Sequence, residues 1–490
     1  MSSIPLSNID HFVVVMLENR SFDNLLGFLY ADNNNISPAG HEFAGLQGTE
    51  SNPDKTGKKV PVFKIDKTQK LAYFYPRADP GEGFANTNVQ LYGINPPLEG
   101  AKPNNQGFVK NFQTNMTMPK ARALAGTQLS DIMGVYPPEM VPVLSGLARG
   151  YAVCDYWFSS APTETFPNRA FVAMATSQGR LGDAPAPFTA PSIFSLLQKN
   201  NFTWAMYGYD KPALARHSIA DITHASNSHF GVFKDFKAAC SAGKLANYVF
   251  LEPQWGSAGN SQHPNYDVSK GEQFLHDVYY AIYGTKVWEK TLLIITYDEH
   301  GGCYDHVPPP ENAVTPDASV GEQNFDFKRF GVRVPAVLVS PYIAQGTVYR
   351  APGWEKGAPA GTPSTPFDHT SILKTVEKRF GLPNLTARDE AAPNIASVLT
   401  LVAARKDDPL SDLSRPKANK QPAFKKAPSH LEKSIAEMAE HVPITDQTGD
   451  IRADEAPPIK TGEQALDFAH NRFKQFHKSR EKFEKTRGRR

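Results

Sequence analysis

Six short apolar runs along the chain predict buried strands of a parallel sheet. Each run is rich in β-branched or aromatic residues, and none approaches the ~20 residues that a membrane-spanning helix needs. Helical patterns lie between several of the runs, at 192–199, 271–283 and 370–380. This alternation predicts an α/β fold with a doubly wound, largely parallel sheet. The predicted strands are 12–17, 151–158, 203–207, 248–251, 292–297 and 334–339.

Three segments depart from this alternation. Residues 31–120 are rich in Asn, Gly and Pro with little periodicity, and we expect a long insertion that covers the site of a catalytic domain spanning 1–405. Residues 406–428 are polar and rich in Pro and Lys, which predicts a linker. Residues 429–490 are predicted to form a helical, basic C-terminal extension.

The extension contains two predicted helices. The first, 429–442, opens with Ser429 followed three residues later by Glu432, which is the pattern of a capping box. The second, 463–487, leads into a terminus whose last twenty residues hold nine Lys or Arg against two Glu. We favour docking of its apolar face on the body over contact of its basic face with a membrane surface or anionic partner, and over disorder. That apolar face is formed by Leu466, Ala469, Phe473, Phe476 and Phe483.

Composition narrows the partners only slightly. With 40% hydrophobic and 21% charged residues, the 490-residue chain has the make-up of a soluble globular protein, and its net charge of +2 favours no particular partner. Three cysteines without metal-like spacing make a disulfide framework improbable, although one bridge stays open. Residues 1–10 lack the basic and apolar regions of a signal peptide, which predicts a cytoplasmic protein, a signal-independent export route or a mature form. Only the terminal charge run would favour nucleic acid, so none is expected as a partner.

Acidic and amide side chains follow the first and fifth predicted strands. Glu18 and Asn19 come directly after the first, and Asp298 and Glu299 come directly after the fifth. Because carboxyl ends of parallel strands share one edge of a sheet, these groups are expected to form one oxygen-rich site for Ca²⁺, Mg²⁺, Mn²⁺ or Zn²⁺. The segment 18–23 could equally begin a helix capped by Asn19 or Ser21. Adjacent acids at a buried strand end are costly unless they are used.

The segment 162–169, PTETFPNR, supplies a candidate nucleophile. It follows the predicted strand 151–158 and precedes a helical pattern, so Thr165 is expected on the intervening turn. A hydroxyl that lies beside a cation and at a helix N-terminus is well placed for nucleophilic attack on an anion. The alternative is that Thr163 or Thr165 only caps the helix.

Together these motifs resemble the bacterial phosphoesterase family that joins phosphatidylcholine-type phospholipases C to respiratory-burst-inhibiting acid phosphatases. QHP at 262–264, DEHGGCYDHVPPP at 298–310 and FDHTSILKTVEKRFGLP at 367–383 belong to the same likeness, which spans about residues 9–395 in order. The resemblance implies an alkaline-phosphatase-like fold, one divalent metal ion and covalent phosphoryl transfer. The metal ligands that it implies are Glu18, Asn19, Thr165, Asp298 and Glu299.

The resemblance also implies roles for individual side chains. Thr165 becomes the nucleophile, Asn19 also contacts a phosphate oxygen, and His263 stabilises the phosphoryl group or serves the leaving oxygen. His369 is expected near the metal or substrate, although it could merely cap the helix beginning near Thr370. Further candidates of the same kind are Arg169, His300, Asp305 and His306.

One position departs from the family pattern. Members often have His in a DPGHG-like loop, whereas residues 79–84 read DPGEGF and place Glu82 there. A carboxylate would repel phosphate, so Glu82 is expected to be a general acid with a raised pKa, a contact for a cationic head group such as choline, or a structural residue that turns away.

The resulting hypothesis is a metal-dependent phosphoric ester hydrolase with a phosphothreonine intermediate, in which His263 or Glu82 protonates the leaving alcohol. We favour a phospholipase C, because aromatic residues of the insertion could line a lipid pocket, although they could equally be core. The alternatives are an acid phosphatase acting on phosphomonoesters, a binding protein on a degenerate phosphoesterase fold, and a sulfatase. The aromatic residues in question are Phe84, Tyr92, Phe108 and Phe112.

Overall fold

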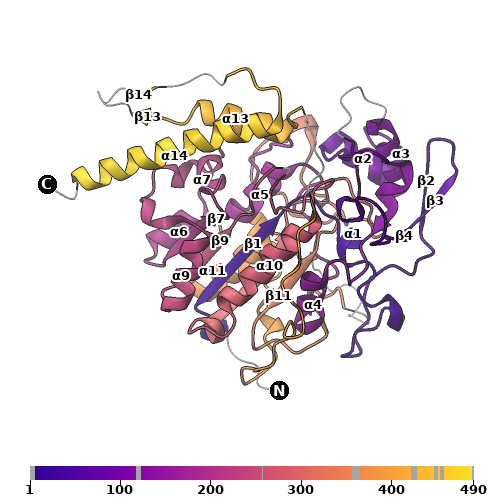
Figure 1. Ribbon diagram of the computed structural model, residues 1–490, viewed down its shortest axis with the longest axis horizontal. Coiled ribbons are helices and arrows are strands. Elements are labelled where there is room, and N and C mark those ends of the chain that lie inside the picture. The colour runs from indigo at the N-terminus through magenta and orange to yellow at the C-terminus, as the bar shows by residue number, and fades with distance from the viewer. Residues whose placement is uncertain are drawn as a thin grey trace.

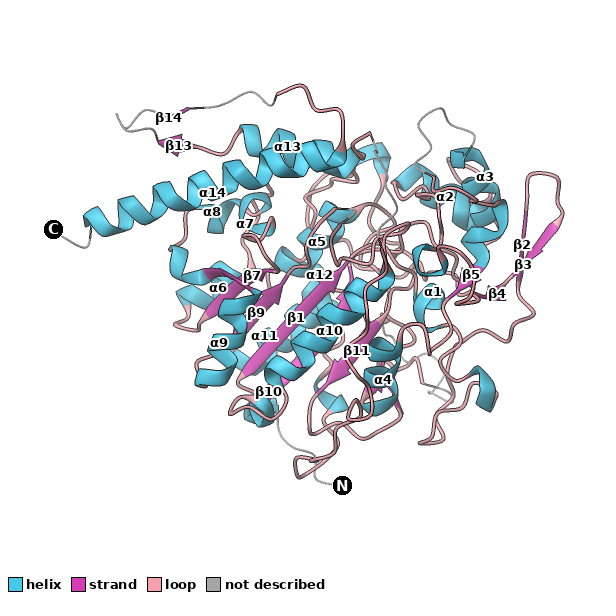
Figure 2. Ribbon diagram, viewed as in Figure 1, coloured by secondary structure: helices cyan, strands magenta, loops and turns pink. Residues whose placement is uncertain are grey.

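An eight-stranded sheet runs through the centre of the molecule (Figure 1, Figure 2). This computed structural model describes residues 6–116, 123–256, 258–355, 365–420, 427–445, 451–452 and 457–487. The strand order is β12-β6-β11-β10-β1-β9-β7-β8, and only β11 runs antiparallel to its neighbours. The predicted α/β fold with a largely parallel sheet is therefore confirmed. The strands are β1 (His11–Leu17), β6 (Ala152–Val153), β7 (Trp204–Gly208), β8 (Phe230–Val232), β9 (Tyr248–Leu251), β10 (Thr291–Tyr297), β11 (Ala336–Val339) and β12 (Thr347–Val348).

The two central strands, β1 and β10, determine where the site lies. They pair in parallel along their whole length, from His11 opposite Thr291 to Leu17 opposite Tyr297. Every residue of β10 and all of β1 except His11 are buried, as expected for strands covered on both faces. Because both strands end in register, the residues that follow them emerge side by side.

Helices cover both faces of the sheet, as the doubly wound prediction requires. Phe12 and Tyr248 are paired neighbours, and they contact Phe380 of α11 and Phe194 of α6 respectively. Tyr207 pairs with Leu251, three positions after Tyr248 and so on the opposite face, and it contacts α9. The helices are α1 (Phe22–Leu26), α4 (Pro142–Gly150), α5 (Thr165–Met174), α6 (Ile193–Lys199), α7 (Ala215–Ser218), α8 (Ala220–Thr223), α9 (Phe233–Ala242), α10 (Val268–Ile282), α11 (Thr370–Phe380) and α12 (Ala387–Ala391).

The predicted strand 151–158 is wrong beyond Val153. Only Ala152–Val153 forms strand β6, and the chain then continues as a loop in which Trp157 and Phe158 make isolated bridges. The apolar composition of this loop reflects burial rather than strand pairing. Trp157 is fully buried, with its ring centroid 5.8 Å from that of Phe367.

The 31–120 segment forms a small layer of its own at the right of Figure 1. Phe108 and Phe112 are buried in a separate apolar cluster, so these two aromatic residues are core and do not line a pocket. Phe84 and Tyr92 remain partly exposed and pack beside Arg329. The elements of this region are β2 (Ser51–Pro53), β3 (Lys59–Pro61), β4 (Phe63–Lys64), α2 (Phe84–Tyr92) and α3 (Phe108–Met116), with β4 paired to β5 (Gly134–Val135).

The C-terminal part lies along the top of the molecule in Figure 1. Before it, Asp408 accepts hydrogen bonds from Tyr279 and Tyr280, so residues near 408 pack on the body. Ser429 and Glu432 form the predicted capping box. The division into 1–405, 406–428 and 429–490 stays a prediction. The elements here are α13 (His430–Glu440), β13 (Ile444–Thr445), β14 (Ile451–Arg452) and α14 (Gly462–Arg487).

The apolar face of α14 docks on the body, as predicted. The Phe473 ring stacks on His217 at 4.1 Å between centroids, and the Arg216 guanidinium lies 5.0 Å from the Phe476 ring. Leu466 and Ala469 are also buried, whereas the side chain of Phe483 lies outside the described residues.

Two further expectations concern the whole chain. Cys154, Cys240 and Cys303 are free, buried thiols, so the single disulfide that the sequence left open does not form. In the part of the chain that the structure describes, no helix has the length and apolar character needed to cross a membrane.

Candidate active site

The ends of β1 and β10 bring the predicted oxygen ligands together. The backbone N–H groups of Asn19 and Glu299 both donate to Asp298 Oδ1, at 2.9 Å. Asn19 has a left-handed backbone (φ 56°), and Gly301 passes so close that an added Cβ would lie 2.2 Å from the Asn19 carbonyl oxygen. Glu18, Asn19, Asp298 and Glu299 are all buried. The two strand ends are thus locked together, with acidic side chains enclosed between them.

Thr165 is the first residue of α5 and is fully buried beside this pair of strand ends. Its Oγ1 donates to Asn19 Oδ1 at 3.3 Å. The helix begins one residue after Glu164 and therefore starts earlier than the sequence predicts. Neither threonine acts as the expected cap, since Glu164 occupies that position and the Thr163 hydroxyl donates to the carbonyl of Leu181. The Thr165 hydroxyl is thus held at a helix N-terminus and faces the acidic group.

Arg169 follows Thr165 by one helical turn and supplies positive charge. Its Nε donates to Asp298 Oδ2 at 2.9 Å, and a terminal nitrogen lies 3.8 Å from Glu252 Oε1. The guanidinium also lies 4.5 Å from the Trp255 ring. Arg169 therefore orients Asp298 and balances part of the charge on this carboxylate.

Glu82 reaches the site from the 31–120 segment, so it does not turn away. Asn19 Nδ2 donates to Glu82 Oε2 at 2.5 Å, and His263 Nε2 lies 3.9 Å from the same oxygen. Burial first, and then the neighbouring Asp79 and Glu164 carboxylates, hold the pKa of Glu82 well above its usual range. Glu82 therefore holds its proton to higher pH than an exposed glutamate does.

The group formed by Glu18, Asp298 and Glu299 fits a divalent cation in its chemistry. Burial, followed by the Asp298 charge, raises the pKa of Glu18 to about 8. Burial, followed by Glu82, raises the pKa of Glu299 well above its ordinary value, and among the described residues its buried Oε1 has no hydrogen-bond partner. Carboxylate and amide oxygens of this kind are ligands for hard or borderline cations.

Two buried histidines contact the acidic residues that follow β10. His369 Nε2 donates to the Asp298 carbonyl at 2.7 Å, and burial lowers the pKa of His369 to about 4. His300 lies 2.7 Å from Gln90 Oε1 and 3.1 Å from Glu299 Oε2, and burial lowers its pKa to about 3. Both are neutral side chains that position the acidic residues. His369 occupies the N-cap position of α11, but its side chain does not cap that helix.

Asp305 and His306 are not brought to this group. Arg333 donates to Asp305 Oδ1 and to Asp23 Oδ1, each at 2.9 Å, and His306 Nδ1 lies 2.6 Å from Asp23 Oδ2. The helix interpretation of 18–23 is also partly right, because Ser21 accepts from the backbone of α1. Sequence reasoning missed Arg333, and nothing in its local sequence marks it as the partner of two distant acids.

Comparison with known proteins decides the family. The model of the phosphoesterase family matches residues 9–383. The chain belongs to this family. This phosphoesterase is 34% identical over 431 residues to non-specific phospholipase C3 of Arabidopsis thaliana, covering 84% of the chain and 77% of that protein. It is 28% identical over 439 residues to phospholipase C A of Mycobacterium tuberculosis, covering 80% and 77%. It is therefore a hydrolase acting on phosphoric esters, and the binding-protein alternative is set aside.

A solved structure with a related outline is the lipoteichoic acid synthase LtaP from Listeria monocytogenes. It shares 10% identity with this phosphoesterase at a TM-score of 0.32, covering 70% of the chain and 86% of that protein. A likeness of this size supports no argument, so the alkaline-phosphatase-like assignment continues to rest on the sequence motifs. The plant relative shows that the family is not confined to bacteria.

A pocket of the phosphoesterase opens between the acidic residues and the C-terminal helices. One side presents Glu18, Trp255, His263 and Tyr266, and the other is formed by α13 and α14. Sequence reasoning did not predict this pocket, because its lining is formed by contacts between residues more than 150 positions apart. The C-terminal residues that line it are Ser429, Leu431, Glu432, Ile435 and Leu466.

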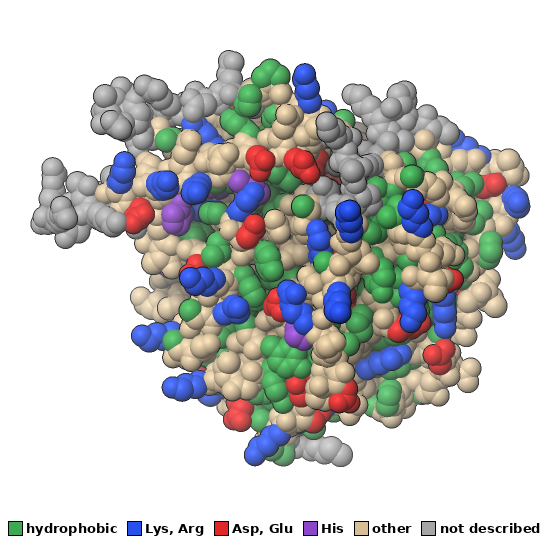
Figure 3. All heavy atoms as spheres, viewed as in Figure 1, with side chains coloured by type: hydrophobic (Ala, Val, Ile, Leu, Met, Phe, Trp, Pro, Cys, Tyr) green, Lys and Arg blue, Asp and Glu red, His purple; other side chains and the backbone are tan. Residues whose placement is uncertain are grey.

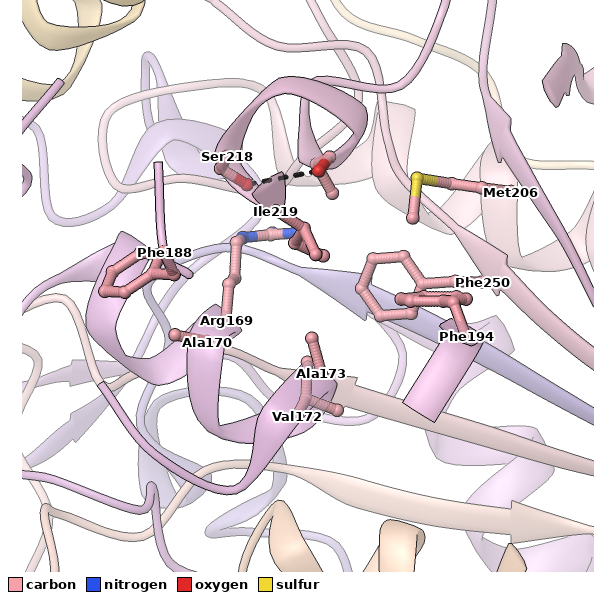
Figure 4. Close-up of a pocket in the computed structure, with 11 residues that line it drawn as sticks. Arg169, Ala170, Val172, Ala173, Phe188, Phe194, Met206, Ser218, Ile219 and Phe250 are labelled. Atoms are coloured by element: carbon pink, nitrogen blue, oxygen red, sulfur yellow. Dashed lines mark hydrogen bonds between the residues drawn. The ribbon is translucent and has the colours of Figure 1, made fainter. Parts of the chain in front are cut away.

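A second, apolar pocket adjoins the site through Arg169 (Figure 4). It lies against α5, with Ala170 on the side of Phe188 and with Val172 and Ala173 on the side of Phe194 and Phe250. No Asp or Glu is among its lining residues, so it offers no group that could hold a cation.

Proposed function

We propose that this phosphoesterase is a metal-dependent phospholipase C that forms a phosphothreonine intermediate on Thr165. The placement of the Thr165 hydroxyl carries the proposal. It is buried at the start of α5, bonded to Asn19, and next to acidic residues whose charge is only partly balanced. The relatives that bear the name phospholipase C support the substrate class.

Each side chain has a defined part in the two displacements. Thr165 Oγ1 passes its proton to a neighbouring carboxylate and attacks phosphorus, the bond from phosphorus to the leaving alcohol breaks, and Glu82 or His263 gives that oxygen a proton. The deprotonated Glu82 or His263 then takes a proton from the water that attacks the phosphothreonine, and the Thr165 oxygen leaves and regains its proton from the carboxylate. Asn19 holds the nucleophile in line, and its amide can donate to a phosphate oxygen.

A divalent ion held by Glu18, Asn19, Asp298 and Glu299 would lower the pKa of the Thr165 hydroxyl and offset the phosphoryl charge. Arg169 keeps Asp298 oriented toward this position. The ion could be Ca²⁺, Mg²⁺, Mn²⁺ or Zn²⁺, because every one of these accepts oxygen ligands.

The acidity of the pocket favours a diester substrate over a monoester. Glu82 and Asp79 lie beside His263. Members of the family often have a histidine at the position of Glu82. A phosphodiester carries one negative charge, so a pocket lined by several acidic side chains accommodates it better than a dianionic monoester, even while Glu82 holds its proton. Leu431 and Ile435 add an apolar wall suited to a lipid. Acid phosphatase activity on monoesters is the alternative.

The basic side of α14 is proposed as a contact for an anionic lipid surface. Lys474, Lys478 and Lys482 are exposed at four-residue spacing, on the side opposite the docked Phe473. Figure 3 shows Lys and Arg side chains gathered at the upper left, where Figure 1 places α14. Such a contact would hold the phosphoesterase beside its substrate.

The decisive experiment compares hydrolysis of p-nitrophenylphosphorylcholine and p-nitrophenyl phosphate. The protein is stripped with EDTA and reloaded with each of the four cations separately. We expect metal-restored activity that favours the choline ester in kcat/KM. Preference for the monoester would establish the phosphatase alternative, and the absence of restorable activity on both substrates would contradict the metal-dependent mechanism.

A further inference from the structure

A second group of acidic side chains and an imidazole lies at the start of the nucleophile helix. Glu164 directly precedes Thr165, Asp183 lies in the loop after α5, and His430 is the first residue of α13. We propose that Glu164, Asp183 and His430 bind a second divalent metal ion, of the Zn²⁺ or Mn²⁺ type.

The three side chains already converge. One carboxylate oxygen of Glu164, one of Asp183 and one ring nitrogen of His430 lie within 4.8 Å of one another. His430 Nδ1 is 3.4 Å from Glu164 Oε2, and the same oxygen accepts from the Asp183 backbone N–H at 2.8 Å. Small adjustments would bring all three to the ~2.0–2.2 Å distances of metal bonds.

An unpartnered oxygen independently points to a ligand. Asp183 is only 1% exposed, and its Oδ1 accepts from the Phe166 backbone N–H at 2.7 Å. Its Oδ2 is also buried, yet within the described parts of the chain it has no hydrogen-bond partner. A buried carboxylate oxygen without a partner is costly, and a cation would remove that cost.

The charge of the group is also incomplete without a cation. Burial, and then the Glu164 carboxylate, hold the pKa of Asp183 well above its usual range. His430 is 64% exposed at its side chain and can balance at most one negative charge, and only while it is protonated. Two carboxylates and one neutral imidazole are instead a donor set that suits Zn²⁺ or Mn²⁺, with water completing the coordination.

The backbone leaves room for this arrangement. A Cβ added to Gly83 would lie 2.7 Å from Glu164 Oε1, although the φ of Gly83 (−64°) is open to any residue. Glycine is therefore required here by space and not by backbone conformation. The exposed His430 side also gives an ion access from solvent.

The second ion would act on the position of Thr165. Glu164 precedes the nucleophile, and Asp183 holds the N–H of Phe166, which follows it. A cation between them would fix both flanks of Thr165 and tie α13 to the catalytic body through His430. These side chains are positioning residues, because in the structure they contact neither Asp298 nor Glu299 by any hydrogen bond or ion pair among the described residues.

The test is the metal content of the full-length protein. After EDTA treatment, reloading with Zn²⁺ and removal of free ion, we expect about two equivalents by elemental analysis. Asp183→Asn and Asp298→Asn should each retain about one. His430→Gln changes an exposed side chain, and it should weaken one Zn²⁺ site at least tenfold in calorimetric titration with an unchanged melting temperature in EDTA. His441→Gln, on another exposed histidine near the end of α13, is the matched control and should bind as the wild type does.

A site loaded with Co²⁺ gives a second readout. Its visible absorption should change in His430→Gln and not in His441→Gln, because only His430 would donate an imidazole nitrogen. Unchanged Zn²⁺ content and affinity in both Asp183→Asn and His430→Gln would overturn the proposal. An equivalent that persists in Asp298→Asn but disappears in Asp183→Asn would support it even if the catalytic ion were absent, so the two proposals fail separately.

Discussion

The segments that follow β1 and β10 supply two buried acidic groups, and these are balanced in different ways. In the first group, Asp23 and Asp305 share Arg333 at 2.9 Å, and His306 completes the contacts of Asp23. The contact with His306 and the Arg333 charge hold the pKa of Asp23 below its ordinary value in spite of burial. Burial raises the pKa of Asp305 to about 6, although the Arg333 charge lowers it. This group is a closed ion-pair network.

The second group contains Glu18, Asp298 and Glu299, and its only bonded arginine is Arg169 among the described residues. Here burial raises the pKa of each carboxyl, and Glu299 Oε1 has no partner within the described chain. Burial is the same in both groups, so what separates them is compensation. A charge-balanced acidic group stabilises the fold, whereas an unbalanced one is suited to holding a cation.

The largest expected effect comes from removing the nucleophile of the unbalanced group. Thr165→Val should lower kcat by about 10³-fold or more, because it removes the proposed nucleophile. The melting temperature should change little, since the hydroxyl bonds only to Asn19 in the described structure. Steady-state kinetics and thermal unfolding test this together.

Thr163→Val is the matched control for that substitution. Thr163 is equally buried and donates to the Leu181 carbonyl outside the acidic pocket. It should retain most of the activity. Near-wild-type rates in Thr165→Val would remove this residue as the nucleophile.

The next effect is on stability and concerns the balanced group. Arg333→Met should lower the free energy of unfolding by about 3–5 kcal/mol at pH 7, because Asp23 and Asp305 would remain buried without their partner. Glu299→Gln, measured in EDTA, should leave the stability unchanged or raise it, since it removes one of several repelling charges. Urea unfolding of both variants makes the comparison. An equal loss in the free energy of unfolding in both variants would contradict the difference in charge balance between the two groups.

The sequence predicted the sheet well, because buried parallel strands are continuous apolar runs. The runs ending at Leu17 and Tyr297 became β1 and β10, in register and with their acidic residues adjacent. The prediction failed at 151–158, where aromatic residues are buried in a loop. Composition reports burial in both cases, and only hydrogen-bond partners separate a strand from a buried loop.

Sequence reasoning anticipated which side chains lie together where motifs immediately follow strands, and it failed where contacts are distant. Glu18 and Asp298 are placed by the ends of paired strands, so their meeting follows from local sequence. Asp305 differs from Glu299 because Arg333 donates a hydrogen bond to it, which leaves Asp305 paired and Glu299 unbalanced. That arginine is remote in sequence from Asp23, and one chain read alone contains no signal of the pairing.

A smaller effect is the pH dependence of stability in the metal-free protein. Below about pH 4.5, Glu18 is protonated in both the folded and unfolded states and contributes nothing. Above that pH the unfolded state releases its proton, whereas the folded state keeps it until about pH 8. Stability should therefore fall as the pH rises from 5 to 8.

Glu18→Gln should flatten that fall, and the metal-loaded wild type should also show less of it. Urea unfolding at several pH values in EDTA measures the slope. A slope that is identical in Glu18→Gln and the wild type would mean that Glu18 is not the group responsible.

The smallest expected effect tests whether Glu82 belongs to the chemistry of the unbalanced group. Burial, and then the neighbouring acids, raise the pKa of Glu82 well above its usual range, so its proton is lost only as pH rises through that raised pKa. The value of kcat/KM for the choline ester should fall along the alkaline limb for this reason. Glu82→Gln should retain activity within about tenfold to a hundredfold of wild type while losing that limb, because its amide still donates a hydrogen bond but cannot titrate. An unchanged limb in Glu82→Gln would assign the proton to His263, 3.9 Å away, and leave Glu82 as a contact for the substrate.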